Sequence, residues 1–554
     1  MVNITSYLKQ KRYSTVLLLI IPLSLSAFTH MWNPAGSPAF HVDESHYMRR
    51  AMQVIQGLGP QESNATYDYG YDHPYFGQIF LGAALSIVNY PDSLDPSVSS
   101  QSIEMLYTIP RVLMGILAVV DTFLVYKIAD ARYNRKVAFV SATLFAVMPV
   151  SSLLRGIFLD SIALPFILLS ILFAIYYAKS SGRIDSEHMV NDAKKLRYFL
   201  ILPSGMFLGL AIFTKLPVFV LIPLIIFILL NKNIINSNNN NNKRTKTLDF
   251  RALGVWFLPV VLIPLIWPAY AISVGQFDSW IQGVIYQTAR DSGGKDLRSS
   301  FVLVYAMDPV LLILAAAATI YGVIRKDYFI LLWSLPYLVF LYFIGWVVPI
   351  HWIILIPILC ISAAMLIDNL INAVSSRKVV KFLPHIAISA FVIIGFLTTS
   401  LLIEKNLNIL YVQLYLYIVQ ELQQDNTDNT SAQMQYLDND GGTTMIGSHR
   451  TRALVWIPLY VFKDNITFRE TDIPKDNFTK SLETKKFLLV ADSGLISRLT
   501  GIDQYERDRR VTQLYYNNSN TIATFIEKNL DKNYFFNIDQ NYGFGRFVDV
   551  RANY

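Results

Sequence analysis

The sequence predicts a mainly α-helical, polytopic membrane bundle followed by a small soluble α/β domain. Three observations predict it: 53% of the 554 residues are apolar, only 16% are charged, and the mean hydropathy is +0.37. Charged residues make up about 25% of an ordinary soluble domain. The composition therefore excludes a soluble globular protein and favours a chain that crosses a membrane several times.

Apolar runs long enough to cross a bilayer recur along the chain. About 20 apolar residues cover the hydrocarbon core, because an α-helix rises about 1.5 Å per residue. Windowed hydropathy predicts about eleven spans, some of them short. They run approximately over residues 15–31, 104–127, 137–150, 163–178, 198–214, 218–230, 253–273, 304–324, 328–348, 352–371 and 383–402. The transmembrane domain is therefore expected at residues 1–403.

Lysine and arginine are distributed unequally between alternate connections. One set holds many of them, and the other holds only Arg49, Arg50, Arg155, Lys215, Arg290, Lys295 and Arg298. Connections rich in lysine and arginine stay in the cytoplasm. We therefore expect a multi-pass protein of the cell membrane with a cytoplasmic N-terminus. An odd number of spans then places the C-terminus outside the cytoplasm.

The first outer loop, residues 32–103, contains two further helical patterns. In the first pattern, apolar side chains recur at helical spacing with polar ones opposite: the apolar face is Tyr47, Met48, Ala51, Val54, Ile55 and Leu58, and the polar face is Arg49, Arg50, Gln53 and Gln56. This pattern predicts an amphipathic helix along the membrane surface. The second pattern, residues 76–88, is too short for a comfortable span and predicts an interfacial or re-entrant helix.

The region from residue 404 to residue 554 differs from the bundle in composition. Its charges are balanced, and alternating apolar blocks such as residues 486–492 are typical of strands. We therefore expect residues 404–554 to form a small extracytoplasmic α/β domain.

An acidic pair, Asp43 and Glu44, follows the first span and opens the first surface helix. One interpretation is structural: Asp43 is the N-cap, and Glu44 is a first-turn acid that suits the helix dipole. The other is catalytic: a carboxylate at the membrane boundary acts as general base for a hydroxyl nucleophile. The residues alone leave both interpretations open.

Two cations lie where a charge needs a partner. Arg111 falls inside the second span, where a guanidinium requires a carboxylate, a phosphate or water. Lys215 lies beside Pro217 between two short spans, an arrangement typical of a broken helix that opens towards a cavity. Snorkelling to the outer interface is the alternative for both cations. Arg155 and Asp160 share a short outer connection, where an ordinary ion pair is the simplest expectation.

These residues together resemble the polyprenyl-phosphate-sugar-dependent glycosyltransferases of the GT-C class. The resemblance is strongest to the dolichyl-phosphate-mannose protein mannosyltransferase family and the lipid A aminoarabinose transferase family. It covers the first half of the chain well, and the segments that carry it are Asp43-Glu-Ser-His-Tyr47, Tyr71-Asp-His-Pro74, Pro110-Arg111, residues 155–160 and residues 209–217.

The resemblance implies a GT-C fold and a role for each matching residue. Asp43 corresponds to the catalytic carboxylate, Glu44 is its acidic neighbour, and Asp160 belongs to a second acidic motif. The remaining residues are implied to bind the donor phosphate or other parts of the substrates: Arg111, Lys215 and Arg155 for the phosphate, and Tyr71 and His73 for substrate.

The implied reaction transfers a sugar, a hexose such as mannose, from a polyprenyl or dolichyl phosphate to an extracytoplasmic protein, lipid or glycan acceptor. Asp43 would deprotonate the acceptor hydroxyl, and the anomeric configuration would invert. The implied partners are thus the donor lipid, the membrane and the acceptor, and nothing points to nucleic acid. No tight spacing of His, Asp and Glu demands a metal, so no cofactor is required and a divalent cation is left open.

A secondary transporter of an anionic or glycolipid substrate is the competing interpretation, because broken helices with intramembrane cations also describe an anion pathway. The two halves of the chain show no convincing internal repeat, and the suspected charges gather towards one face of the membrane. A noncatalytic protein of the same architecture is a third interpretation. The sequence favours the enzyme.

Overall fold

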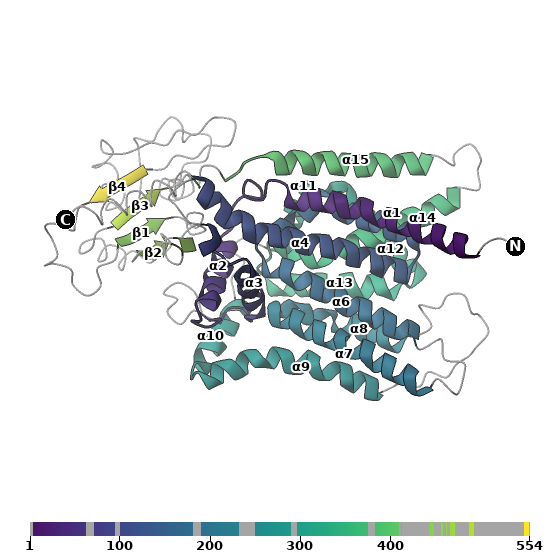
Figure 1. The fold of residues 1–554 in the computed structure, drawn as a ribbon, viewed down its shortest axis with the longest axis horizontal. Coiled ribbons are helices and arrows are strands. Elements are labelled where there is room, and N and C mark those ends of the chain that lie inside the picture. Colours follow the sequence, from purple (N-terminus) through teal and green to yellow (C-terminus); the bar gives the residue numbers. More distant parts are fainter. Residues whose placement is uncertain are drawn as a thin grey trace. The chain divides into compact units, whose positions relative to one another are not determined.

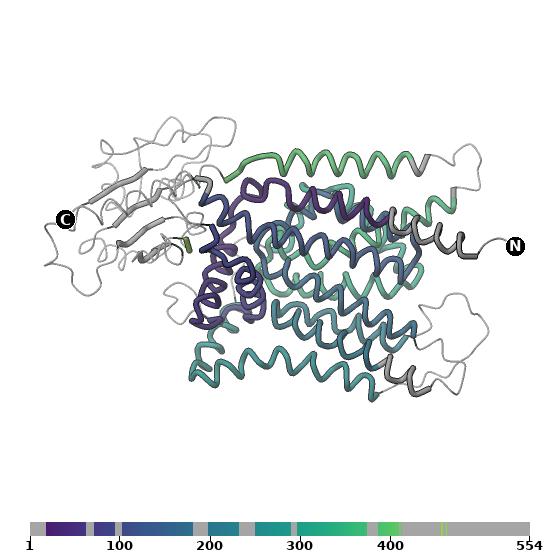
Figure 2. The backbone as a smooth tube through the Cα atoms, in the orientation of Figure 1, coloured from purple at the N-terminus to yellow at the C-terminus, as the bar shows by residue number. Residues whose placement is uncertain are grey.

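The computed structural model describes residues 4–61, 71–94, 100–180, 190–231, 250–289, 296–374, 383–408 and 412, with residues 443–447, 456–457, 461, 466–470, 487–491 and 548–552 (Figure 1; Figure 2). The chain forms two compact units. The first comprises Met1–Pro34, Pro60–Phe80 and Arg111–Glu404, and the second comprises Ala35–Gly59, Leu81–Pro110 and Lys405–Tyr554.

Helices make up the first unit, and Figure 1 shows the long ones lying side by side. The α-helices are α1 (Ile4–Met31), α4 (Ser100–Arg132, which begins in the second unit), α5 (Arg135–Val147), α6 (Leu159–Ser180), α7 (Val190–Thr214), α8 (Ile222–Leu230), α9 (Phe250–Ser273), α10 (Phe277–Thr288), α11 (Leu297–Met307), α12 (Pro309–Arg325), α13 (Tyr328–Ile344), α14 (Ile356–Val374) and α15 (Leu383–Glu404). Short 3-10 helices interrupt them at η2 (Pro149–Arg155), η4 (Leu216–Leu221) and η5 (Pro349–Leu355).

The apolar segments expected from the sequence all fall on helices. Within the described ranges, five helices are long and apolar enough to cross a membrane, and up to seven spans result if each of two bent pairs counts as one. Shorter apolar helices occupy Leu18–Met31, Phe76–Ile87, Tyr198–Thr214, Leu216–Leu230 and Tyr328–Ile344. A multi-pass membrane protein is therefore confirmed, whereas the total of eleven spans and the orientation of the termini stay predictions.

Two of the predicted spans, residues 137–150 and 304–324, contain a bend. The chain turns by 116° between α11 and α12, and by 66° between α5 and η2. Asp308 ends α11 and accepts a hydrogen bond from the Leu311 N–H at 3.2 Å, so it caps α12, whose first residue is Pro309. Proline fits the first turn of a helix but cannot continue the helix before it. Pro149 stands in the same position after α5.

Glycines on α7 let the neighbouring helix α9 approach closely. A Cβ atom on Gly205 would clash with the carbonyl oxygen of Trp256, and one on Gly209 would clash with that of Pro259. Small residues four apart form such a contact surface between membrane helices. Helix α7 also packs along α6, so both α6 and α9 contact it. Helix α7 ends at Thr214, just before Lys215.

In the second unit, helix α2 (Val42–Ile55) corrects the prediction of an amphipathic surface helix. Three of the four residues of the predicted polar face are covered: Arg50 is fully buried, and Arg49 and Gln53 are less than one tenth exposed, whereas Gln56 is exposed. Leu58, assigned to the apolar face, is instead 67% exposed. The polar side chains are covered because protein packs around the helix, and periodicity in sequence does not distinguish such a cover from membrane or solvent.

Helix α3 (Phe76–Ile87) begins at the start of the second predicted pattern and ends one residue before that pattern does. It starts in the first unit and continues into the second. A Cβ on Gly82 would lie 3.0 Å from the Ala51 carbonyl oxygen and 3.1 Å from Val54, so α3 lies directly against α2.

The described part of the C-terminal region is a four-stranded sheet with the order β2-β1-β3-β4. Strands β1 (Thr443–Gly447), β2 (Ile466–Glu470) and β3 (Phe487–Ala491) are parallel, and β4 (Val548–Ala552) pairs antiparallel with β3. The strand expected at residues 486–492 is β3. Parallel neighbours require crossover connections. Only residues 456–457 and 461 of these connections are among the described residues, so the α/β assignment stays a prediction.

Candidate donor and acceptor sites

The acidic pair opens helix α2 through a capping box in which Asp43 is not the cap. His41 is the N-cap: its Nδ1 accepts the Asp43 backbone N–H at 3.2 Å, and Glu44 Oε2 accepts the His41 backbone N–H at 2.9 Å. Glu44 is fully buried. The interpretation of Asp43 as N-cap was therefore wrong, because the N-cap lies two residues earlier, at His41. Glu44 instead completes the reciprocal pair.

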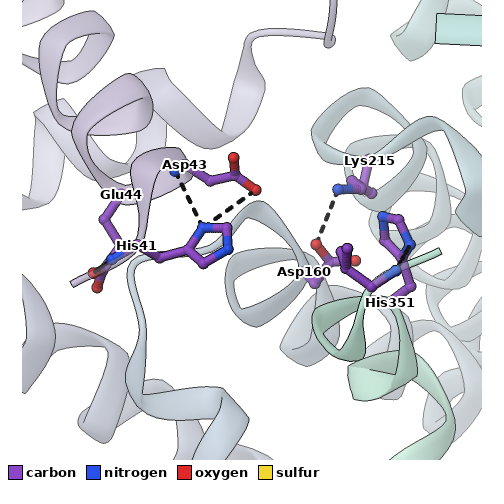
Figure 3. Close-up of polar contacts among 7 residues, drawn as sticks. His41, Asp43, Glu44, Asp160, Lys215 and His351 are labelled. Carbon is purple, nitrogen blue, oxygen red and sulfur yellow. Dashed lines mark hydrogen bonds and ion pairs between the residues drawn. The ribbon is translucent and has the colours of Figure 1, made fainter. Parts of the chain in front are cut away.

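The Asp43 carboxylate is left for another task. Its side chain is 31% exposed, and its Oδ2 lies 3.7 Å from His41 Nδ1 (Figure 3). Because Nδ1 accepts a backbone hydrogen bond, the neutral imidazole carries its proton on Nε2. This carboxylate, held on the first turn of a helix, is therefore accessible from solvent.

Asp160 and Lys215 form a buried ion pair in the first unit. Asp160 lies in the first turn of α6, and Lys215 follows the end of α7 in an extended conformation. Lys215 Nζ lies 3.0 Å from Asp160 Oδ2, with side-chain exposures of 5% and 1% (Figure 3). Snorkelling of Lys215 is thereby excluded, and Asp160 pairs with Lys215 rather than with Arg155 as the sequence suggested.

Two residues that sequence reasoning did not single out, His351 and Tyr337, lie near this pair. Figure 3 shows the His351 ring beside Asp160 and Lys215. The Tyr337 hydroxyl donates to the His351 carbonyl oxygen at 3.1 Å and lies within electrostatic range of Asp160. Both residues sit in apolar surroundings, His351 in η5 and Tyr337 in α13. The sequence around a lone histidine or tyrosine in an apolar segment does not indicate which residues its side chain will contact.

Arg155 and Arg111, predicted to bind the donor phosphate, contact the end of α1. The Arg155 guanidinium donates to the carbonyl oxygens of Thr29 and Trp32 and, at 3.1 Å, to that of Asn33. Arg111 donates to the Pro34 carbonyl oxygen at 2.9 Å. The last carbonyls of a helix have no intrahelical donor, and a cation there also suits the helix dipole. Both arginines are buried and therefore do not snorkel.

Tyr71 and His73 lie in the turn before α3. The Tyr71 hydroxyl donates to Gln276 Oε1 at 2.8 Å, and its ring packs in an aromatic cluster with Phe213 and Trp267. Burial, aided by Tyr270, raises the pKa of Tyr71 above its ordinary value of 10.0. The phenol therefore stays protonated near neutral pH and remains a donor. His73 is half-buried in the same turn.

A metal site does not emerge from the part of the chain that the structure describes. No three His, Cys, Asp or Glu side chains gather there in a way that could hold an ion.

Comparison with known families identifies part of the chain. The model for the dolichyl-phosphate-mannose-protein mannosyltransferase family matches residues 61–275. This range contains Tyr71, Arg111, Arg155, Asp160 and Lys215. No curated protein matches the sequence significantly.

Comparison with solved structures extends the similarity to the rest of the fold. The apo oligosaccharyltransferase of Archaeoglobus fulgidus is 12% identical, with a TM-score of 0.55, and the alignment covers 89% of this chain and 70% of that one. ArnT from Cupriavidus metallidurans in the apo state is 11% identical, with a TM-score of 0.52 and 98% of each chain covered.

A third similar structure is the archaeal oligosaccharyltransferase AglB from Archaeoglobus fulgidus in complex with an inhibitory peptide and a dolichol-phosphate. It is 11% identical, with a TM-score of 0.52, and the alignment covers 87% of this chain and 70% of that one. The resemblance inferred from the sequence is thus confirmed: residues 61–275 match the model of the dolichyl-phosphate-mannose-protein mannosyltransferase family, and the fold is similar to those of the oligosaccharyltransferase and ArnT.

Proposed function

We propose that this membrane glycosyltransferase moves a hexose, with mannose as the first choice, from a polyprenyl or dolichyl phosphate to a hydroxyl group on an extracytoplasmic acceptor. The observation that carries the proposal is the buried pair of Lys215 and Asp160 at a broken helix, inside the segment that matches the mannosyltransferase family. A buried ammonium at a helix break is suited to an anionic headgroup whose lipid tail stays in hydrocarbon.

Asp43 acts in this proposal as the general base. Its carboxylate takes the proton of the acceptor hydroxyl, and the oxygen bonds to the anomeric carbon while the bond from that carbon to the phosphate oxygen breaks. The lipid phosphate leaves as an anion, so no strong general acid is needed. Attack opposite the leaving group inverts the anomeric configuration. Glu44 supports the base by fixing the first turn of α2.

Lys215 stabilises the charge that develops on the leaving phosphate. Asp160 acts through Lys215: as its counter-ion, it holds the ammonium in place before the donor arrives. His351 lies beside this pair and can donate a further hydrogen bond to an anion (Figure 3). Arg155 and Arg111 contribute positive potential while their guanidinium groups hold the carbonyls that end α1.

The acceptor is proposed to be a protein hydroxyl, in line with the family whose model matches residues 61–275. We further propose an orientation with the N-terminus in the cytoplasm and the C-terminal region outside the cytoplasm. The transporter alternative is not favoured, because the matching family and the similar solved structures are transferases.

Two measurements test the proposal. The first incubates the purified full chain with a panel of polyprenyl-phosphate sugars and follows release of the free lipid phosphate. The second compares, by mass spectrometry, the surface glycoproteins, glycolipids and glycans of cells with and without the protein. We expect mannose to be consumed from its carrier and to appear on serine or threonine residues. Transport of an intact glycolipid without loss of its sugar would overturn the proposal.

A further inference from the structure

Two stretches far apart in sequence are bonded to each other beside the start of α2. Asn408, which follows α15, is buried, and its side-chain amide makes three hydrogen bonds to the loop that leads to Asp43. Its Nδ2 donates to the carbonyl oxygens of Ala35 at 2.7 Å and Pro38 at 2.8 Å, and its Oδ1 accepts the Phe40 N–H at 2.8 Å. The Leu407 N–H adds a bond to the Gly36 carbonyl oxygen at 2.8 Å.

A second contact reaches the same loop from further along the C-terminal region. The buried Trp456 donates its indole N–H to the Tyr107 hydroxyl at 3.0 Å. The Tyr107 ring stacks on Phe40, with ring centroids 3.9 Å apart. Phe40 directly precedes His41, the residue that caps α2. Trp456, Tyr107 and Phe40 therefore form a continuous chain of contacts that ends one residue from the cap.

We propose that the C-terminal region positions the catalytic loop, with Asn408 and Trp456 as positioning residues for the transfer reaction. The inference rests on the proposed function, because it assigns these residues to the placement of Asp43. Asn408 satisfies three backbone groups of a short irregular segment, residues 35–40. Trp456 fixes the aromatic ring at the end of that segment. Together they set where α2 begins and so where the Asp43 carboxylate points.

The physical reason is the sensitivity of base catalysis to geometry. A displacement of about 1 Å in a reacting group can cost about 10²-fold in rate. The backbone of residues 35–40 is held from one side by Asn408 and from the other by Phe40 stacking on Tyr107. Removal of either contact leaves the capping box itself intact, since its bonds lie between His41, Asp43 and Glu44. Helix α2 should then still form, while the Asp43 carboxylate is displaced from the position needed for proton transfer.

The experiment uses the full-length chain purified in detergent, with undecaprenyl-phosphate mannose as donor and the acceptor found by the glycan comparison. Asn408→Ala removes all three bonds, and Asn408→Asp keeps the size of the side chain but removes both donated bonds. Asn134→Ala is the matched control: it removes an asparagine that caps α5 through the Lys136 and Val137 N–H groups, away from the loop. Donor KM, kcat, melting and amide exchange at Phe40 are measured for each.

We expect both Asn408 variants to lower kcat about tenfold or more, by loss of alignment, with the donor KM close to that of the wild type and with faster exchange at Phe40. Asn134→Ala should lower the melting temperature without changing kcat or exchange at Phe40. A melting loss in Asn134→Ala accompanied by the same fall in kcat would show that stability alone sets the rate, and would overturn the inference.

Trp456→Phe and Tyr107→Phe test the second contact, because each removes one partner of the same hydrogen bond and keeps a ring. The double variant should lose no more kcat than either single variant, since groups that share one interaction are not additive. Normal kcat and unchanged Phe40 exchange in folded Asn408→Ala and Trp456→Phe proteins would overturn the inference. If the wild type transfers no sugar, the proposed function fails, while amide exchange alone still decides whether Asn408 holds the loop.

Discussion

Asp43 and Asp160 are both aspartates in the first turn of a helix, yet their surroundings give them different chemistry. Asp43 is 31% exposed beside a histidine, whereas Asp160 is 1% exposed and lies 3.0 Å from an ammonium. A carboxylate that water reaches can accept a proton from an incoming hydroxyl. A buried carboxylate 3.0 Å from a lysine ammonium is instead held as a counter-ion, because removal of either partner would leave a buried charge uncompensated. The comparison teaches that the same residue at the same helix position is either open to solvent or held in an ion pair, according to burial and partner.

The largest expected effect on transfer comes from Asp43→Asn. The amide cannot accept a proton, so loss of base catalysis should slow transfer by about 10²–10⁴-fold. Stability should be unchanged, since His41 rather than Asp43 caps α2. The measurement is the single-turnover rate at saturating donor, with melting and donor binding as controls. Near-normal transfer by a folded, donor-binding variant would remove Asp43 as the base.

The largest expected effect on stability comes from Lys215→Met. It leaves the Asp160 carboxylate buried without its counter-ion, and breaking such a pair costs about 3–5 kcal/mol. The melting temperature in detergent should therefore fall, and the donor KM should rise because the phosphate loses its ammonium.

The double variant Lys215→Met/Asp160→Asn sharpens this test. With both charges removed, most of the lost stability should return, while transfer should stay low. Recovery of transfer together with stability would mean that Lys215 serves the fold alone and does not contact the donor.

Arg155→Met tests whether Arg155 holds the carbonyl groups at the end of α1 or binds the donor phosphate. It leaves the carbonyl oxygens of Thr29, Trp32 and Asn33 without their donor, and a buried polar group without a partner costs about 1–3 kcal/mol. We expect a lower melting temperature with the donor KM close to that of the wild type. A raised KM at unchanged stability would instead return Arg155 to the phosphate site predicted from the sequence.

The smallest expected effect is that of Glu44→Gln. Glutamine can accept the same N–H as glutamate in a capping box, so the bond from the His41 N–H should survive. Helix α2 should lose less than about 1 kcal/mol, and transfer should fall far less than in Asp43→Asn. The comparison of the two rates under identical conditions is the check. A loss as large as that of Asp43→Asn would assign Glu44 a direct part in proton transfer.

The sequence by itself determined that the chain is a multi-pass helical membrane protein, and its motif segments carried the resemblance to the GT-C glycosyltransferases. Apolar length and the local identity of motif residues carry that information, because span formation depends mainly on the transfer of a segment into hydrocarbon. The helix break at Lys215 was also predictable, since Pro217 follows it. So was the capping box at Glu44 in principle, because a glutamate lies three residues after the residue that caps α2.

Only the tertiary structure decided the partners of the charged residues. Asp160 and Lys215 are 55 residues apart in the sequence and meet because α6 and α7 pack along each other. Arg155 reaches carbonyls more than 120 residues away, and Asn408 bonds to a loop about 370 residues before it. Arg49, Arg50 and Gln53 of α2 are buried for the same reason, because residues distant in the sequence pack over them. Periodicity states which side chains share a face, whereas long-range packing determines what covers that face and which charges it brings together.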